Sequence, residues 1–286
     1  MTPGVFAGGY KPSNYEGWTA TDPLRLREAL ANSVNVAAVR VVEDVGPSNV
    51  VEWAHALGIR SAMRPDLSLA LGSYEVEPLE LCGAYATFAA GGMYEEPSLI
   101  TRIVGPNGSD VALPPQVVSH RVLDEAEAYV TTNLLTSVID HGTGMRAKQL
   151  GRPLAGKTGT SNASKDTWFA GYSTEIVAVV WVGYDDGKPL GASETGASAA
   201  LPAWVDFMKA AHEHKPASEF PRPAGVSVVT IDARSGLLPF EGDTATLDEV
   251  FLDGTEPTVV TGADPVAPTS PDADAAPLQP PPAIDP

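Results

Sequence analysis

Residues 154–184 read LAGKTGTSNASKDTWFAGYSTEIVAVVWVGY, and this stretch decides the fold. It contains three runs that are rich in β-branched and aromatic residues, at 154–158, 168–173 and 176–184. Polar turn residues separate the runs, which is the pattern of consecutive β-strands. The spacers are short, whereas a parallel crossover needs a dozen or more residues, so we expect antiparallel neighbours.

The first of these strands carries the tetrapeptide Lys157-Thr158-Gly159-Thr160 near its end. A strand with this sequence can present a cation, two hydroxyls and backbone N–H groups along one wall of a cleft. Gly159 has no side chain, so the backbone of a substrate could approach closely there. The tetrapeptide is therefore a candidate for one wall of a binding cleft.

The same residues also fit a second motif. Gly151, Gly156, Lys157 and Thr158 match the P-loop pattern G-x-x-x-x-G-K-[ST]. Residues 179–186 (VVWVGYDD) offer an apolar strand that ends in aspartate, as a Mg²⁺-binding strand would. A P-loop lysine must open a helix whose N-terminus faces phosphate, but here Gly, Ser and Asn follow, and then strands. A P-loop nucleotidase remains a remote alternative.

The composition argues against several classes of function for this chain. The chain has 286 residues, 43% of them apolar, and a formal net charge of −18. The acidic balance argues against nucleic acid as a partner, because no basic stripe would neutralise phosphates. We expect no membrane span, signal peptide or anchor in this sequence, and the histidine spacing predicts no metal site. Cys82 is the one cysteine, which excludes an internal disulfide.

Helical patterns surround the strand region. Asp22-Pro23 predicts a helix start, with Asp as N-cap and Pro at the first position, and the helix should run to about residue 32. Further helices are expected at 36–45, 47–57, 78–90, 124–139 and 201–212. Residues 67–74 predict a loop or short strand, 97–104 and 111–118 a small two-stranded excursion, and 226–230 a short strand.

Ser33-Val34-Asn35 lies between the first two predicted helices. Ser and Asn commonly satisfy nearby backbone groups at helix ends, so a helix junction is one interpretation. The other interpretation places a hydroxyl and an amide on the wall of a cleft. The tripeptide alone does not decide between them.

Taken together, these segments resemble the transpeptidase domain of bifunctional (class A) penicillin-binding proteins. The signature of that family is S-x-x-K, then S-x-N, then K-T-G. The matching stretches are YKPSNYEG at 10–17, REALANSVN at 27–35, LALGSYEVEPLELCGAYATFAAGG at 69–92, GKTGTSNASKDTWFAGY at 156–172 and FLDGTEPT at 251–258. They cover most of the chain in the family's order.

The resemblance implies an α+β fold of the penicillin-binding transpeptidase and serine β-lactamase type, with helices around an antiparallel sheet. It implies acyl transfer from D-Ala-D-Ala stem peptides of peptidoglycan, inhibition by β-lactams, no cofactor, and a place in the cell envelope on the outer face of the cytoplasmic membrane. The Lys157 ammonium would place a positive charge near the substrate carboxylate, and the Thr158 and Thr160 hydroxyls would donate hydrogen bonds to that carboxylate. Ser33 would shuttle a proton, and Asn35 would orient the substrate amide.

One part of the family signature does not occur in the sequence. No serine is followed by lysine three residues later, and Gly8 stands where S-x-x-K would precede Lys11-Pro12. We therefore expect the nucleophile, its helix and the preceding strands to be missing, so that the chain is inactive alone and an upstream polypeptide supplies the rest. The alternative is a non-catalytic scaffold that binds stem peptides or β-lactams.

The expected domain organisation has three parts. Residues 1–220 would form the partial transpeptidase domain, and residues 221–260 a small C-terminal extension of it. Residues 261–286 are rich in proline, alanine and aspartate with few large apolar groups, which predicts a disordered tail.

Overall fold

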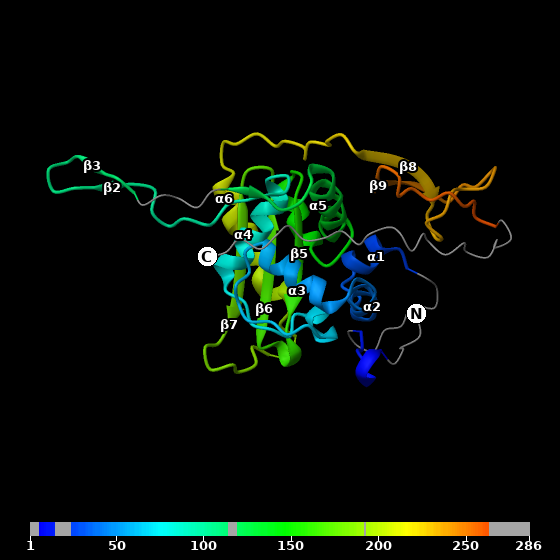
Figure 1. The fold of residues 1–286 in the computed structure, drawn as a ribbon, viewed down its shortest axis with the longest axis horizontal. Coiled ribbons are helices and arrows are strands. Elements are labelled where there is room, and N and C mark those ends of the chain that lie inside the picture. The colour runs from blue at the N-terminus through cyan, green and yellow to red at the C-terminus, as the bar shows by residue number, and fades with distance from the viewer. Residues whose placement is uncertain (1–5, 15–23, 114–118, 192, 263–286) are drawn as a thin grey trace.

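A three-stranded antiparallel sheet forms the centre of the computed structural model, which describes residues 6–14, 24–113, 119–191 and 193–262 (Figure 1). The strands are β5 (Ala155–Thr160), β6 (Asp166–Tyr172) and β7 (Val177–Gly183), in the order β5-β6-β7. Lys157 pairs with Ala170, and Trp168 with Trp181. All three strands and their antiparallel pairing were predicted from the sequence and are confirmed.

Helices cover both faces of this sheet. Helix α6 (Leu201–Ala211) packs on one face, where Trp204 is fully buried against Phe169 and its indole N–H donates to the Ala178 carbonyl at 3.0 Å. Helices α4 (Pro78–Ala89) and α5 (Glu125–Asp140) pack on the other face, around the buried ring of Tyr172. Successive strand side chains point to opposite faces, so each strand contributes to both cores.

The remaining helices pack mainly on α5 and on one another. They are α1 (Leu26–Ala31), α2 (Asn35–Val45), α3 (Pro47–Ala56) and the 3₁₀ helix η3 (Leu67–Leu71). Helix α2 ends at Gly46, whose φ of 90° suits glycine, and α5 begins with a capping box of Asp124 and Glu127. Residues 22 and 23, where a helix start was predicted, lie outside the described residues. Arg25 is extended, so the predicted helix does not include it, and the described helix begins at Leu26.

Two further strand pairs extend from the body in opposite directions (Figure 1). The first joins β2 (Ile103–Val104) and β3 (Asp110–Val111), which are much shorter than the expected excursion; residues 114–118 of that prediction lie outside the described residues. The second joins β8 (Val226–Asp232) and β9 (Thr246–Leu252), of which only β8 was predicted. Residues 67–74, predicted as loop or strand, contain η3 instead.

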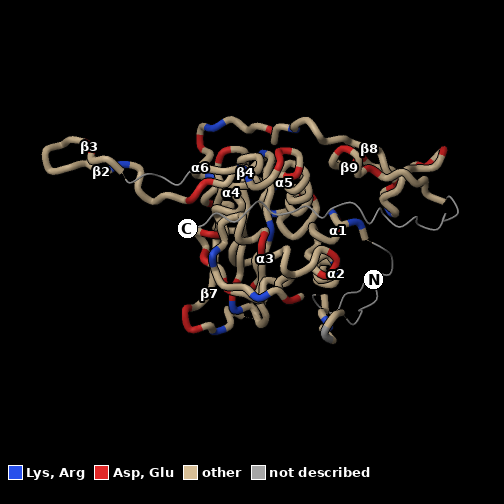
Figure 2. Tube along the Cα trace, in the orientation of Figure 1, with Lys and Arg blue, Asp and Glu red and all other residues tan. Residues whose placement is uncertain are grey.

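The chain also forms several shorter elements. They are η1 (Ala7–Gly9), β1 (Met93–Tyr94), β4 (His120–Arg121), η4 (Met145–Leu150), η5 (Asn162–Ser164) and the single π-helical turn η6 (Gly196–Ala200). Along the backbone, the described Lys and Arg residues lie as separate spots among the Asp and Glu residues (Figure 2). No helix within the described ranges is long and apolar enough to cross a membrane. Their His, Cys, Asp and Glu side chains form no group of three that could hold a metal ion.

Candidate active site

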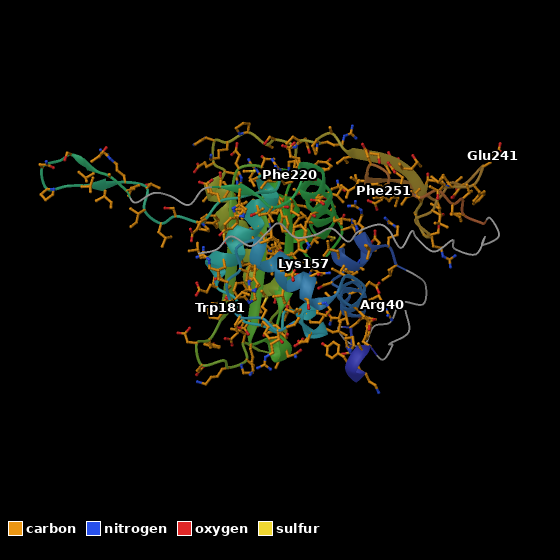
Figure 3. All side chains as sticks on the ribbon, viewed as in Figure 1. Arg40, Lys157, Trp181, Phe220, Glu241 and Phe251 are labelled. Carbon is orange, nitrogen blue, oxygen red and sulfur yellow. The ribbon has the colours of Figure 1, made fainter. Side chains whose placement is uncertain are left out.

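The structure brings together the lysine of the first strand and the serine between the first two helices. Figure 3 shows Lys157 near the middle of the molecule. Its Nζ donates a hydrogen bond to Ser33 Oγ at 2.8 Å and another to the Thr158 carbonyl oxygen at 2.9 Å. The two residues are 124 positions apart in the sequence, so tertiary structure alone makes this contact.

The backbone of Ser33 explains how its hydroxyl reaches the strand. Its φ of 54° is left-handed, the position that glycine usually occupies at the end of a helix. The Ser33 N–H donates to the Leu30 carbonyl at 3.1 Å, and the Val34 N–H donates to the Ala29 carbonyl at 2.9 Å. These two bonds are a Schellman motif that ends α1, with serine in place of glycine.

The environment of Lys157 changes its proton affinity. Burial disfavours the charged ammonium and lowers the pKa of Lys157 to about 8. Lysine with such a pKa is mainly charged at pH 7 but carries an accessible neutral fraction. The side chain can therefore attract an anion and can also exchange a proton with the Ser33 hydroxyl next to it.

A turn after α5 connects the two walls of this site. The Thr143 N–H donates to the Ala31 carbonyl at 3.0 Å, and Thr143 Oγ1 lies 2.7 Å from Thr158 Oγ1. A Cβ on Gly142 would lie 2.3 Å from the Ala31 carbonyl oxygen, so only glycine fits there. Residues 142–144 are thus packed tightly between the end of α1 and strand β5.

The last residue of β5 is fixed by the loop that precedes α6. The Gly196 N–H donates to Thr160 Oγ1 at 3.0 Å. A Cβ on Gly196 would lie 2.6 Å from the Gly159 carbonyl oxygen and 2.5 Å from the Trp168 carbonyl oxygen. Because Thr160 Oγ1 accepts from Gly196, its own hydroxyl proton is directed to another acceptor.

Asn35, the third residue proposed for catalysis, is positioned differently. Its side-chain N–H donates to the Ser13 carbonyl at 2.8 Å, and the neighbouring Val36 N–H donates to Asn14 Oδ1 at 3.0 Å. Within the described residues, its amide has no hydrogen bond to Ser33 or Lys157. The described contacts join Asn35 to the segment 10–14, and not to the lysine.

The strand context contradicts the P-loop alternative. Gly156, Lys157 and Thr158 lie inside β5, which continues to Thr160, and they do not form a loop that opens a helix. Gly151 ends η4 with a left-handed φ of 62°. Phosphate binding by a P-loop needs the N-terminus of a helix directly after the lysine, and that helix does not exist here.

Thr143 and Gly196 were not identified from the sequence as parts of the site. The signal for both was a glycine-rich run, HGTG at 141–144 and ETGAS at 194–198, which is also typical of an ordinary loop. Only the hydrogen bonds to Thr158 and Thr160 distinguish these turns as parts of the site.

The chain matches known sequences in two consecutive parts. Residues 5–208 match the family described as "Penicillin binding protein transpeptidase domain", and residues 222–262 match "Penicillin-binding protein 1A, C-terminal domain". Penicillin-binding protein 1A of Aquifex aeolicus is 39% identical over 255 residues, which cover 87% of this chain and 35% of the relative. Penicillin-binding protein 1A of Rickettsia conorii is 36% identical over 249 residues, covering 79% of this chain and 31% of that protein.

Solved structures show the same relation. The crystal structure of penicillin-binding protein 1A from Haemophilus influenzae has a TM-score of 0.80 and 30% identity, covering 88% of this chain and 43% of that one. PonA1 of Mycobacterium tuberculosis in complex with penicillin V has a TM-score of 0.67 and 27% identity, covering 76% of this chain and 64% of that one. The chain spans about a third of the length of the curated relatives it matches. It belongs to the penicillin-binding protein transpeptidase family, and it corresponds to the C-terminal transpeptidase portion of class A penicillin-binding proteins.

Proposed function

We propose that the chain takes part in D,D-transpeptidation, the acyl transfer from D-Ala-D-Ala stem peptides that cross-links peptidoglycan in the bacterial cell envelope. The observation that carries this proposal is the 2.8 Å contact between Lys157 Nζ and Ser33 Oγ. This contact between Ser33-Val34-Asn35 and Lys157-Thr158-Gly159 supports a common site that would include the Thr158 and Thr160 hydroxyls. The ligands would be stem peptides and β-lactams, both of which carry a carboxylate.

The strand wall would bind the substrate carboxylate. The Lys157 ammonium supplies the positive charge, and the hydroxyls of Thr158 and Thr160 supply hydrogen bonds. The Gly196 N–H occupies an acceptor position on Thr160 Oγ1, which leaves the Thr160 proton free to bind the anion. Because Gly159 has no side chain, a peptide backbone can approach the strand closely there. The N–H of Thr160 would be one donor to the developing oxyanion.

Ser33 would transfer a proton to the leaving amine. Its Oγ accepts from Lys157, so its own proton can point toward the substrate. The lowered pKa of Lys157, about 8, allows the lysine to replace that proton or take it up at neutral pH. Asn35 would orient the substrate amide only after its side chain leaves the Ser13 carbonyl.

The attacking serine is the part of the reaction that this sequence does not provide. No serine in it is followed by lysine three residues later. We therefore propose that the chain binds the ligands without being acylated, and that an upstream polypeptide supplies the nucleophile. The second candidate function, a non-catalytic scaffold for stem peptides or β-lactams, is favoured by the same observation.

Two measurements on the purified chain test this proposal. Intact-mass analysis after incubation with a reactive penicillin should show no adduct. Saturable binding of an acyl-D-Ala-D-Ala peptide should weaken about 10- to 100-fold in Lys157→Met, because a charge-assisted hydrogen bond is lost. Lys165→Met, which removes an exposed lysine beside the same strands, is the matched control and should bind like the wild type.

A penicillin adduct, or a failure of the binding prediction, would contradict the proposal. A stoichiometric penicillin adduct would show that another residue of the chain is acylated, with Ser33 the first to be tested. Peptide binding that is absent in the wild type, or equal in Lys157→Met, would reject the assignment of this wall to the substrate carboxylate.

A further inference from the structure

A carboxylate of the C-terminal hairpin is buried against two helices that lead into the site. Glu249 on β9 is only 7% exposed. It accepts hydrogen bonds from Arg27 Nε at 2.8 and 3.0 Å and from Arg25 Nη1 at 2.9 Å, and Arg27 Nη2 also donates to it. Burial alone would raise the pKa of Glu249, but the hydrogen bond and charge of Arg27 outweigh burial and hold the pKa below its usual value.

Arg27 links this carboxylate to α5. Its Nη1 donates to the Asn133 carbonyl at 2.7 Å and to Ser137 Oγ at 2.6 Å, and its Nη2 donates to Asn133 Oδ1 at 2.6 Å. A planar guanidinium with both edges occupied allows one orientation of its partners. The single side chain therefore fixes the relative position of α1, α5 and β9.

Arg25 fixes the beginning of α1 in the same way. Its Nε donates to the Ala233 carbonyl at 3.0 Å, just after β8, and its Nη2 donates to Glu28 at 2.9 Å. Glu28 Oε2 also lies 3.4 Å from His141 Nε2, which follows α5. Arg25 and Glu28 therefore connect α1 both to the hairpin and to the residue that follows α5.

Both helices held by this cluster end at the site. Helix α1 ends at Ala31, two residues before Ser33, and α5 ends at Asp140, three residues before Thr143. If the only role of the interface were to attach the hairpin, apolar side chains would serve at least as well, since buried ion pairs contribute little net stability. The pairs instead impose a geometry, which is what a precise contact between Ser33 and Lys157 requires.

We propose that Glu249 is a positioning residue of the site, and that the β8–β9 hairpin holds α1 and α5 so that Ser33 reaches Lys157 and Thr143 reaches Thr158. The inference rests on the proposed function of that site for its biological meaning, but the positioning itself is a property of the free protein. On this proposal, the C-terminal hairpin helps to set the geometry of the site in the transpeptidase portion.

The test uses the titration of Lys157 in the folded chain, observed by NMR of its side-chain ¹³Cε and assigned with Lys157→Met. The wild-type midpoint should lie at about 8. In Glu249→Gln the walls of the site separate, water reaches the ammonium, and the midpoint should rise by about one unit or more toward the ordinary 10.5. Asp248→Asn is the matched control: Asp248 is on the same strand, exposed and bound to Thr230, and the midpoint should stay at its wild-type value.

A purely structural role predicts a different result. Glu249→Gln would then unfold at lower temperature while the folded protein kept the wild-type Lys157 midpoint, and this outcome overturns the inference. Should Glu249→Gln fail to fold, Arg27→Lys keeps the charge and removes the planar fork, and it must raise the midpoint in the same direction. An unchanged midpoint in folded Arg27→Lys also counts against the inference.

Peptide binding separates this inference from the proposed function. A midpoint that rises in Glu249→Gln, with no binding of an acyl-D-Ala-D-Ala peptide by the wild type, supports the positioning role and rejects the proposed function. Wild-type binding that Glu249→Gln leaves unchanged, together with an unchanged midpoint, supports the proposed function and rejects the positioning role.

Discussion

Ser33 holds a left-handed backbone conformation, which costs a residue with a side chain roughly 1–2 kcal/mol. Glycine is the residue that usually occupies this place in a Schellman motif. Strain of this kind is found where the surrounding structure determines the conformation and the site uses it. Here the strained residue contributes the hydroxyl that meets Lys157 Nζ, and glycine would remove that hydroxyl.

The strain predicts an unusual order of stability among variants of Ser33. Ser33→Gly and Ser33→Ala both delete the hydroxyl, but only glycine adopts a φ of 54° without cost. We expect Ser33→Gly to be more stable than Ser33→Ala by about 1 kcal/mol in urea denaturation. Equal stabilities, or a more stable alanine variant, would show that the conformation is not strained.

At the residue scale, the sequence motif proposes the lysine and the threonines as site residues, but it does not indicate the residues that contact the threonines. The family motif identifies Lys157, Thr158 and Thr160 because they are contiguous. Thr143 and Gly196 act through hydrogen bonds to residues 15 and 36 positions away. Neither has a local pattern that differs from an ordinary turn, so only the tertiary structure reveals them.

At the element scale, the sequence predicts the elements whose own residues and flanking turns determine their structure. The strands β5, β6 and β7 follow from their β-branched and aromatic residues and from the short polar spacers between them, and α5 follows from its capping box. The start of α1 does not follow from Asp22-Pro23, because the described helix begins only after Arg25. Arg25 is extended and donates to the Ala233 carbonyl, a tertiary contact 208 residues away that local propensity cannot indicate.

Strand β9 was missed for a related physical reason. Its sequence TLDEVFL places two consecutive acidic residues in the middle of the strand, and acidic residues are depleted in strands. Glu249 is nevertheless buried, because Arg25 and Arg27 compensate its charge. The neutralising partners are more than 220 residues away, so the sequence around β9 contains no trace of them.

The packing of the π-helical turn η6 against β5 predicts the effect of one methyl group. In Gly196→Ala the new Cβ would lie 2.5 Å from the Trp168 carbonyl oxygen, so the turn must move away from the strand. We expect a loss of about 1–3 kcal/mol in the free energy of unfolding. Hydrogen exchange should also become faster at the amide of residue 196, which loses Thr160 as acceptor. Unchanged exchange and stability would contradict this close packing.

At the scale of the whole molecule, the sheet and its helices form the body, and the β2–β3 hairpin extends away from it (Figure 1). The segment that leads into the hairpin exposes Leu99 at 85% and Ile100 at 56%, and the hairpin itself exposes Val104 at 53%. A segment with few packing contacts opens locally at little free-energy cost.

The difference in packing between the body and the projecting hairpin predicts the order of proteolytic cleavage. Among the described residues, those at 98–112 should be cut before any strand or helix of the body under native conditions. Mass spectrometry of the first fragments identifies the site, and near-ultraviolet circular dichroism checks that the nicked body keeps its tryptophan environment. Initial cleavage within α5 or β5–β7 would contradict the stability that we assign to the body.

The bond between Arg27 and Glu249 joins residues that are 222 positions apart. During synthesis on the ribosome, the arginine emerges first and has no carboxylate of β9 to bind until almost the whole described chain has been translated. A domain generally folds as a unit while it is being made, and contacts of long sequence separation form late. Helix α1, and with it Ser33, would therefore reach its final place only when β9 leaves the exit tunnel, so a nascent chain would carry Lys157 long before it carries a finished site.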